Sequence, residues 1–175
     1  LLRWKRYVQG DEDLWMANTA RFTERTGVKV TVESIVGEEI RAKGGEFGAT
    51  TGRPRRCGWL DTVILGHAAM INGFTGIALT KLDILDDLKK IKICTAYRYK
   101  GKVYRHFPKE AEILGRCTPV YEEVEGWNAS TVGIREFRKL PVRAQRYIKR
   151  IEELVGVKAH LISTGQRRDE LITLK

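Results

Sequence analysis

The chain has 175 residues, which is long enough for one domain with a hydrophobic core. Hydrophobic residues make up 42% and charged residues 31%, values typical of a globular protein, so the composition excludes a disordered chain. No stretch approaches the about 18 apolar residues that a membrane span needs. The charged segment Leu1 to Arg6 is unlike a signal peptide.

The net charge of +10 favours an anionic partner, such as a nucleotide, a phosphorylated metabolite or nucleic acid, without choosing among them. Cys57, Cys94 and Cys117 form no CxxC pair, so we expect reduced thiols in a cytoplasmic protein. The three histidines are not at zinc-ligand spacing, and we expect no metal site built by this chain alone. The chain begins with Leu rather than Met, which indicates a fragment or a processed product.

The first part of the chain is predicted to form a helix, a strand and a second helix. Asp11 to Thr26 carries apolar residues at helical spacing and is followed by Gly27. Valines then alternate with polar residues over 28–32, the period of a half-buried strand. A short helix from Glu38 to Lys43 leads into a loop rich in Gly and Arg, Gly44 to Gly58.

The middle of the chain is predicted to form a helix, a buried strand and a hairpin. One apolar helical face comprises Leu60, Val63, Ile64, His67, Ala68 and Ile71. The run 77–79 is continuously apolar, which suits a strand covered on both faces. Alternating residues over 91–97 and a turn at Lys100-Gly101-Lys102 predict a hairpin with 103–107, and a further strand is expected over 120–124.

The clearest helix begins near Leu140-Pro141 and is capped by Gly156. Its inner face is predicted to comprise Ala144, Tyr147, Ile148, Ile151, Leu154 and Val155. A strand is predicted over 157–162. Because strands and helices alternate, we expect an α/β fold with a mixed, largely parallel sheet, flanking helices and a small hairpin.

Three short segments carry the candidate functional residues. The first, the Arg-rich loop, comprises Ala49, Thr50, Thr51, Gly52, Arg53, Pro54, Arg55 and Arg56. Each guanidinium can grip a carboxylate or a phosphate at two points, the hydroxyls add hydrogen bonds, and Gly52 permits close approach of the backbone. The same composition also suits a solvated basic loop or a nuclear-localisation-like patch.

The second segment, Thr80-Lys81-Leu82-Asp83, directly follows the predicted strand 77–79. Ligands of open α/β sheets bind outside the carboxyl ends of strands. A carboxylate there could accept two N–H groups from the edge of guanine, and the aliphatic part of Lys81 could lie along the base. A strand end with a surface Lys and a helix-capping Asp gives the same pattern.

The third segment, Ser163-Thr164-Gly165, also follows a predicted strand. Small hydroxyl-bearing residues and glycine allow a ligand to approach the backbone, but they suit an ordinary turn equally well. Trp59, Trp127, Tyr121 and Tyr147 are interpreted as packing residues rather than stacking platforms for bases.

Taken in order, several stretches resemble adenylosuccinate synthetase. They are residues 45–61, 79–85, 120–122, Gly126-Trp127, 147–156 and 162–165. The resemblance runs from about Val36 to Lys175 and divides the chain into a segment 1–35 without a match and a C-terminal synthetase region 36–175, part of a P-loop-NTPase-like fold. Segment 1–35 has a faint, short similarity to solute-binding proteins.

The resemblance implies a GTP-dependent ligase of purine (AMP) biosynthesis that joins L-aspartate to IMP, giving adenylosuccinate, GDP and phosphate. By resemblance, residues 49–55 form the loop for aspartate and IMP, with Arg55 also near the GTP phosphates. Lys81, Leu82 and Asp83 correspond to the guanine-reading segment. Ser163, Thr164 and Gly165 correspond to the second wall of the guanine pocket.

The resemblance also implies features that this chain does not itself contain. The family takes its Mg²⁺ ligands, phosphate loop and catalytic residues from an N-terminal region, so no catalytic residue and no metal ligand is assigned here, and we expect no turnover by this chain alone. Gln166 and Arg167 stand where the family usually has Pro-Asp, so the last loop departs from the family's pattern there. Glu125 replaces a usual Pro before Gly126-Trp127. A homodimer is implied, whereas a membrane partner is not.

One alternative is a non-catalytic module that binds anions, solutes or nucleic acid through its charge. The sequence contains no base-reading motif such as a zinc finger, which argues against binding of nucleic acid. Another alternative is a poorly folding product with exposed sheet edges.

Overall fold

The computed structural model describes residues 2–4, 21, 24–25, 33–35 and 37–174. The chain divides into two compact units, Leu1–Gly58 (unit 1) and Trp59–Lys175 (unit 2), which are described separately. The helix expected over 11–26 lies outside the described residues except for Arg21, Glu24 and Arg25, which are helical. The strand expected over 28–32 lies outside them entirely.

In unit 1, strand β1 (Leu2–Trp4) pairs in parallel with β2 (Glu33–Ile35). Helix α2 (Gly37–Gly44) confirms the predicted short helix, and the segment beyond it has no regular secondary structure, as expected for the Gly- and Arg-rich loop.

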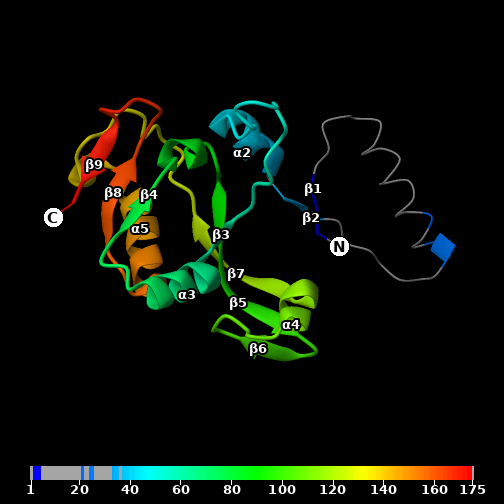
Figure 1. The fold of residues 1–175 in the computed structure, drawn as a ribbon. Helices are drawn as coiled ribbons and strands as arrows, with labels where there is room; N and C mark the ends of the chain where they lie inside the picture. The colour runs from blue at the N-terminus through cyan, green and yellow to red at the C-terminus, as the bar shows by residue number, and fades with distance from the viewer. Residues whose placement is uncertain (1, 5–20, 22–23, 26–32, 36, 175) are drawn as a thin grey trace. The chain divides into compact units, whose positions relative to one another are not determined.

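Unit 2 confirms the α/β fold and contains two sheets with strand pairs of both orientations (Figure 1). In the first sheet, β5 (Lys90–Tyr99) pairs in parallel with β3 (Leu60–Asp61) and antiparallel with β6 (Lys102–Tyr104) and β7 (Thr118–Glu125). In the second sheet, β8 (Ala159–Ser163) pairs in parallel with β4 (Ile77–Leu79) and antiparallel with β9 (Leu171–Thr173).

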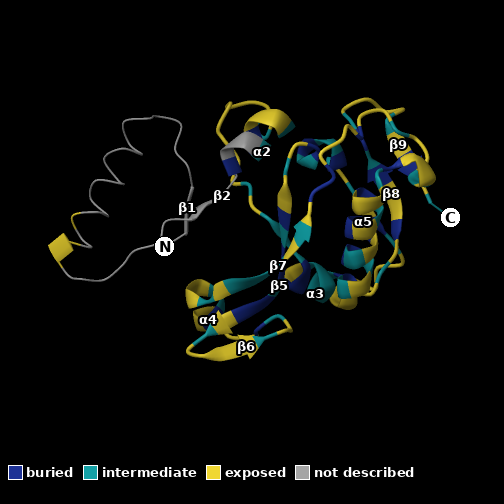
Figure 2. Cartoon of the chain, turned by 180° about the vertical axis from the view of Figure 1, so that it is seen from behind, coloured by how far each residue is buried: buried dark blue, intermediate teal, exposed yellow. Residues whose placement is uncertain are grey.

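The helical elements of unit 2 are α3 (Thr62–Asn72), η1 (Leu82–Leu85), α4 (Ala111–Arg116), η2 (Phe137–Lys139) and α5 (Val142–Val155). Gly156 ends α5 in the left-handed conformation at φ 75°, as the sequence predicted. The core combines the inner face of α5 with side chains of β5, β8 and β9, and Figure 2 shows buried residues interspersed with exposed ones along these segments. Every residue predicted for that face is buried except Leu154, which is half-buried.

The predicted hairpin is confirmed as the pair β5–β6. Its two-residue turn, Lys100-Gly101, has positive φ at both positions (46° and 78°), the arrangement that matches the twist of antiparallel strands. Strand β7 confirms the strand expected over 120–124 and extends it at both ends.

Helix α3 differs from its prediction in the face that it buries. Its buried residues are Thr62, Val63 and Ala69, whereas Ile64 and Ile71, expected to face inward, are 49% and 65% exposed. Leu60, also assigned to that face, belongs to β3 instead. The helix is apolar around most of its circumference, so periodicity could not determine which side packs.

Asp61 determines where α3 begins. Its Oδ1 accepts hydrogen bonds from the backbone N–H groups of Val63 (3.0 Å) and Ile64 (3.2 Å), and its Oδ2 accepts one from the Tyr97 hydroxyl (2.6 Å). Burial and the bond to Asp61 raise the pKa of Tyr97, so the phenol stays protonated. One carboxylate therefore joins α3 to β5.

Strand β4 is confirmed, but it is not covered on both faces. Ile77 is buried, whereas Ala78 is exposed and Leu79 is half-buried. The reason is its position, because β4 lies at the edge of its sheet and pairs only with β8 among the described strands.

Candidate functional site

The Arg-rich loop of unit 1 forms a tight turn that is tied to α2. The Gly48 N–H donates to the Arg53 carbonyl at 2.8 Å, and an isolated bridge joins Phe47 to Pro54. At the base of the turn, Arg41 Nε donates to the Arg55 carbonyl at 2.7 Å. The base is therefore fixed, while residues 49–56 are all exposed.

Glycines make this turn possible. Gly52 has φ 64°, which a residue with a side chain adopts only with strain. A Cβ on Gly48 would approach Thr51 Oγ1 to 2.8 Å.

The two central arginines of this loop differ in their pairing. Arg55 forms an ion pair with Glu46, Nη1 to Oε2 at 3.0 Å, although 58% of its side chain is exposed. The guanidinium of Arg53 makes no hydrogen bond or ion pair with any described residue, and only its backbone N–H contacts Thr51 Oγ1, at 3.4 Å. Arg53 therefore presents all its guanidinium donors to solvent, as an anion-binding loop requires.

Unit 2 brings the other two candidate segments together at one sheet edge. Strands β4 and β8 are parallel neighbours with Leu79 opposite Ile162, so their carboxyl ends lie side by side. Segment 80–83 follows the first strand and segment 163–165 follows the second. Helix η1, which contains Leu82 and Asp83, also contacts β8. This is the place where open α/β sheets bind ligands.

Segment 80–83 is held by alternate burial of its side chains. Leu82 (4% exposed) and Ile84 (6%) enter the core, whereas Lys81 and Asp83 stay half-buried. Lys81 adopts the left-handed conformation with φ 62°, which is uncommon for a residue other than glycine. The buried side chains of Leu82 and Ile84 thus anchor the turn, and Lys81 and Asp83 lie at the carboxyl end of β4.

Segment 163–165 is more tightly bonded than its composition suggested. Thr164 is fully buried, and its hydroxyl donates to the Ile134 carbonyl at 2.8 Å while its backbone N–H donates to the Glu170 carbonyl at 3.0 Å. The Ser163 hydroxyl donates to the Gly165 carbonyl at 2.9 Å. Thr164 therefore supports the loop, and Ser163 and Gly165 remain partly accessible to a ligand.

Sequence reasoning missed the role of Asp86, a buried carboxylate just beyond η1. Asp86 is 5% exposed and accepts hydrogen bonds from Trp127 Nε1 (2.7 Å), Thr131 N (2.7 Å) and Thr131 Oγ1 (2.8 Å). These bonds hold the segment after Asp83 against the loop after β7. Trp127 and Tyr147 are buried, which confirms them as packing residues, and Trp59 and Tyr121 are half-buried at the margin of the core.

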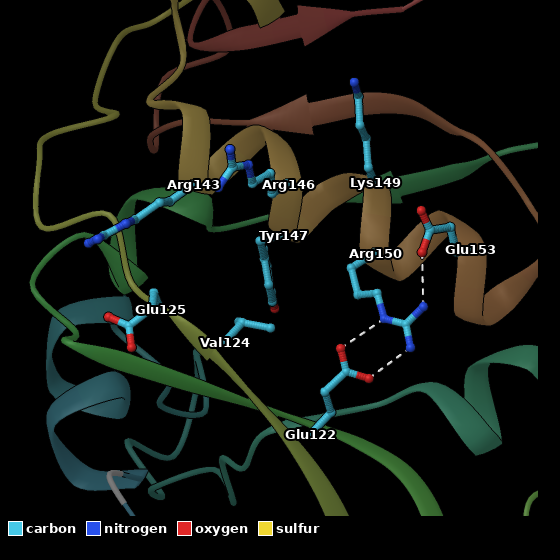
Figure 3. Close-up of a pocket in the computed structure, with 9 residues that line it drawn as sticks. All are labelled: Glu122, Val124, Glu125, Arg143, Arg146, Tyr147, Lys149, Arg150 and Glu153. Atoms are coloured by element: carbon cyan, nitrogen blue, oxygen red, sulfur yellow. Dashed lines mark hydrogen bonds and ion pairs between the residues drawn. The ribbon is translucent and has the colours of Figure 1, made fainter.

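A separate pocket of about 550 Å³ lies between β7 and α5 (Figure 3). Across it, Arg150 donates to both carboxylate oxygens of Glu122, each at 2.8 Å, and Arg150 Nη1 also donates to Glu153 at 2.9 Å. The hydrogen bonds from Arg150 hold the pKa of Glu122 below its ordinary value. None of the candidate residues lines this pocket.

We expect this ion pair to contribute acid-sensitive stability. Because the pKa of Glu122 is lowered on folding, the contribution is complete above the pKa of the unfolded chain and is lost as the pH falls through the folded pKa, below 4.5. Urea unfolding between pH 3 and 7 should show a steeper acid loss for the unmodified chain than for Glu122→Gln. Arg150→Met should remove the same component, and the double variant no more than either alone; additive losses would contradict the pairing.

Two features are absent from the described residues. They contain no group of three or more His, Cys, Asp or Glu side chains that could hold a metal ion. No helix in the same part of the chain is long and apolar enough to cross a membrane.

Comparison with known proteins gives consistent matches. A family model described as adenylosuccinate synthetase matches residues 17–172, and so extends into segment 1–35. The adenylosuccinate synthetase of Thermodesulfovibrio yellowstonii is 54% identical over 154 residues, covering 86% of this chain and 36% of that protein. The adenylosuccinate synthetase of Moorella thermoacetica is 57% identical over 157 residues, covering 88% of this chain and 37% of that protein.

A solved structure of fully ligated adenylosuccinate synthetase from Plasmodium falciparum superposes with a TM-score of 0.75 at 39% identity. The match covers 80% of this chain and 34% of that one. The chain thus spans little more than a third of the length of these relatives.

Proposed function

Because the chain belongs to the adenylosuccinate synthetase family, we propose that it provides the guanine-binding part and the aspartate/IMP loop of a GTP-dependent ligase. The observation that carries the proposal is the shared edge of β4 and β8, where Asp83 and the segment 163–165 follow neighbouring strands. The reaction would be the joining of L-aspartate to IMP, with formation of adenylosuccinate, GDP and phosphate.

In this proposal, Asp83 selects the nucleotide. Guanine presents two N–H donors, N1–H and the 2-amino group, on one edge, and a carboxylate can accept both. Adenine lacks that pair of donors. The aliphatic part of Lys81 covers one face of the base, Leu82 holds the turn in place, and Ser163, Thr164 and Gly165 form the opposite wall. The helical turn that carries Asp83 is fixed from below by Leu82 and Ile84, so the carboxylate is held in position before the nucleotide arrives.

In the proposed loop of residues 49–55, Arg53 binds aspartate and IMP, because it is the exposed guanidinium without an ion pair among the described residues. Arg55 would exchange its exposed ion pair with Glu46 for a contact with aspartate and the GTP phosphates. Exchange of such a pair costs little, about 0–1 kcal/mol. Ala49, Thr50, Thr51, Gly52 and Pro54 supply the turn, its hydroxyls and its backbone groups.

Mg²⁺, the phosphate loop and the catalytic groups would come from the portion of the family that this chain does not span. When bound, Mg²⁺ neutralises charge on the phosphates of GTP. The homodimer, the cytoplasmic location, the inactivity of the isolated chain and the boundary at residue 36 stay predictions. A non-catalytic nucleic-acid-binding module is not favoured, because family membership accounts for the Arg-rich loop.

Thermal unfolding with added nucleotide tests the proposal. GTP at 100 times its Kd should stabilise the chain by about 2.7 kcal/mol, and ATP at the same concentration should stabilise it much less. Unfolding should be followed by the fluorescence of Trp127, which is buried in the core of unit 2, in a variant with the other tryptophans replaced by Phe. Equal protection by both nucleotides, or none by either, would refute the guanine pocket.

A further inference from the structure

The pocket between β7 and α5 has the size of a ligand site. Its volume of about 550 Å³ lies within the range of about 300–1,000 Å³ that pockets for small molecules occupy. Val124 of β7 and the ring of Tyr147 on α5 give it apolar surface, to which the aliphatic stems of the charged lining residues add. None of the residues proposed to bind guanine, aspartate or IMP lines this pocket, so the proposed reaction does not account for it.

The hydroxyl of Tyr147 is an unused hydrogen-bonding group in this pocket. Tyr147 is only 7% exposed, and its ring packs against Trp127 with the ring centroids 5.8 Å apart. Figure 3 shows the hydroxyl pointing toward Val124 of β7, and it makes no hydrogen bond with any described residue. Burial raises the pKa of Tyr147 to about 12, so the hydroxyl is protonated and can donate. Because buried polar groups normally have a partner, we expect an acceptor from outside these residues.

The charges around the pocket favour an anion as the source of that acceptor. The lining has four cationic side chains and three carboxylates, a net charge of +1, namely Arg143, Arg146, Lys149, Arg150, Glu122, Glu125 and Glu153. Arg150 already pairs with Glu122 and Glu153, so these three largely compensate one another. Arg146 and Lys149 are exposed and make no hydrogen bond or ion pair within the part of the chain that the structure describes. A cationic ligand is less favoured, because Glu125 is the one lining carboxylate that Arg150 does not pair with.

Two contacts fix α5 against β7 and the segment after it. Arg150 donates to both oxygens of Glu122 at 2.8 Å, and Arg143 Nη1 donates to the Gly126 carbonyl at 3.1 Å. Arg143 and Arg150 lie two helical turns apart, so the helix is tied at two positions along the pocket. A pocket whose walls are already fixed loses little conformational freedom when a ligand binds.

We propose that this pocket is a second ligand site, which binds a small carboxylate with an apolar body. The hydroxyl of Tyr147 donates to a carboxylate oxygen, and the flexible side chain of Arg146 turns to pair with the same group. The apolar body lies against Val124 and the ring of Tyr147. A single negative charge balances the net charge of the lining. The proposal goes beyond the guanine pocket and does not depend on it, so it would stand even if GTP did not bind.

Titration of the chain with benzoate, followed by the amide signals in nuclear magnetic resonance, tests the proposal. Benzamide and benzylamine are probes of the same size, one neutral and one cationic. We expect benzoate to shift the amides of Val124 and Tyr147, and to bind at least about fivefold more tightly than benzamide, the effect of one charge pair. Benzylamine should bind more weakly than either. No shift with benzoate, or binding of benzylamine at least as tight as that of benzoate, would overturn the proposal.

Tyr147→Phe separates the role of the hydroxyl from that of the ring. It removes no hydrogen bond among the described residues, so the urea midpoint of unfolding should stay unchanged, whereas benzoate should bind about 2- to 10-fold more weakly. Arg146→Gln should weaken benzoate about 2- to 5-fold. Tyr104→Phe and Arg105→Gln are the matched controls, because neither residue lines the pocket, and both variants should bind benzoate normally. Unchanged affinity in Tyr147→Phe, or an equal loss in Tyr104→Phe, would refute the site.

Two competition experiments distinguish this site from the guanine pocket and from a protein interface. Saturating GDP should leave the Kd of benzoate unchanged, and displacement of benzoate by GDP would show that benzoate reports the guanine pocket instead. The portion of the Moorella thermoacetica synthetase that the match leaves out should also leave the benzoate shifts in place. Loss of the shifts on its addition would show that this face is covered by protein, and would overturn the proposal.

Discussion

Asp83→Asn should abolish the preference of the chain for GTP over ATP and create a preference for xanthosine triphosphate. The carboxylate of Asp83 would accept both N1–H and the 2-amino group of guanine. An asparagine amide offers one acceptor and one donor, which opposes the 2-amino group but matches N1–H and the 2-oxo group of xanthine. Losing a hydrogen bond to a charged group costs about 1.5–3 kcal/mol, so GTP affinity should fall about 10- to 150-fold.

Calorimetric titration of the variant with GTP, ATP and xanthosine triphosphate measures this change. Asp87→Asn is the matched control, because Asp87 is an exposed aspartate four residues further along. It should retain the order of nucleotide affinities of the unmodified chain. If Asp83→Asn bound GTP as tightly as the unmodified chain, Asp83 could not be the residue that reads guanine.

Asp86→Ala should destabilise unit 2 more than any exposed charge substitution. The change leaves three buried donors, Trp127 Nε1 and both the N–H and the hydroxyl of Thr131, without their acceptor. Each buried donor left unsatisfied costs about 1–3 kcal/mol, so we expect a total loss of about 3–5 kcal/mol in the free energy of unfolding.

Urea unfolding followed by the fluorescence of Trp127 measures this loss, with Asp87→Ala as the control. Surface substitutions of that kind change stability by about 0.5 kcal/mol or less. A loss below about 1 kcal/mol for Asp86→Ala would show that water replaces the carboxylate as the hydrogen-bond acceptor. That result would contradict the proposal that Asp86 holds η1 against the loop after β7.

Local patterns in the sequence predicted most elements of unit 2. Helix α5 carries apolar residues on one face between Pro141 and Gly156, so its face and its end were both evident. The hairpin followed from alternation on both sides of Lys100-Gly101. In these segments the short-range pattern and the tertiary packing favour the same structure, so neither had to override the other.

The errors arose where packing partners, rather than local patterns, decide burial. Helix α3 is apolar on several faces, so its sequence identified Val63 as inward-facing but did not show that Ala69 packs inward while Ile64 and Ile71 stay exposed. The apolar run of β4 predicted cover on both faces, but Ala78 is exposed because no second strand lies beside it among the described residues.

The candidate site was predictable only in part. Segments 80–83 and 163–165 were each identified because they follow a predicted strand. That the two segments lie side by side depends on the pairing of β4 with β8, which are about 80 residues apart in sequence. No periodicity encodes a pairing over that separation. The hydrogen bonds of the buried residues Asp86 and Thr164 could not be predicted either, because the neighbouring sequence does not distinguish a buried Asp from an exposed one.

The most direct test of the guanine-binding edge is amide mapping by nuclear magnetic resonance during titration with GDP. We expect the amide signals of residues 81–83 and of 163–165 to shift together, with one Kd, and AMP to leave them unchanged. Shifts confined to one of the two segments, or found only around the pocket of Glu122 and Arg150, would contradict a guanine site formed by the ends of β4 and β8.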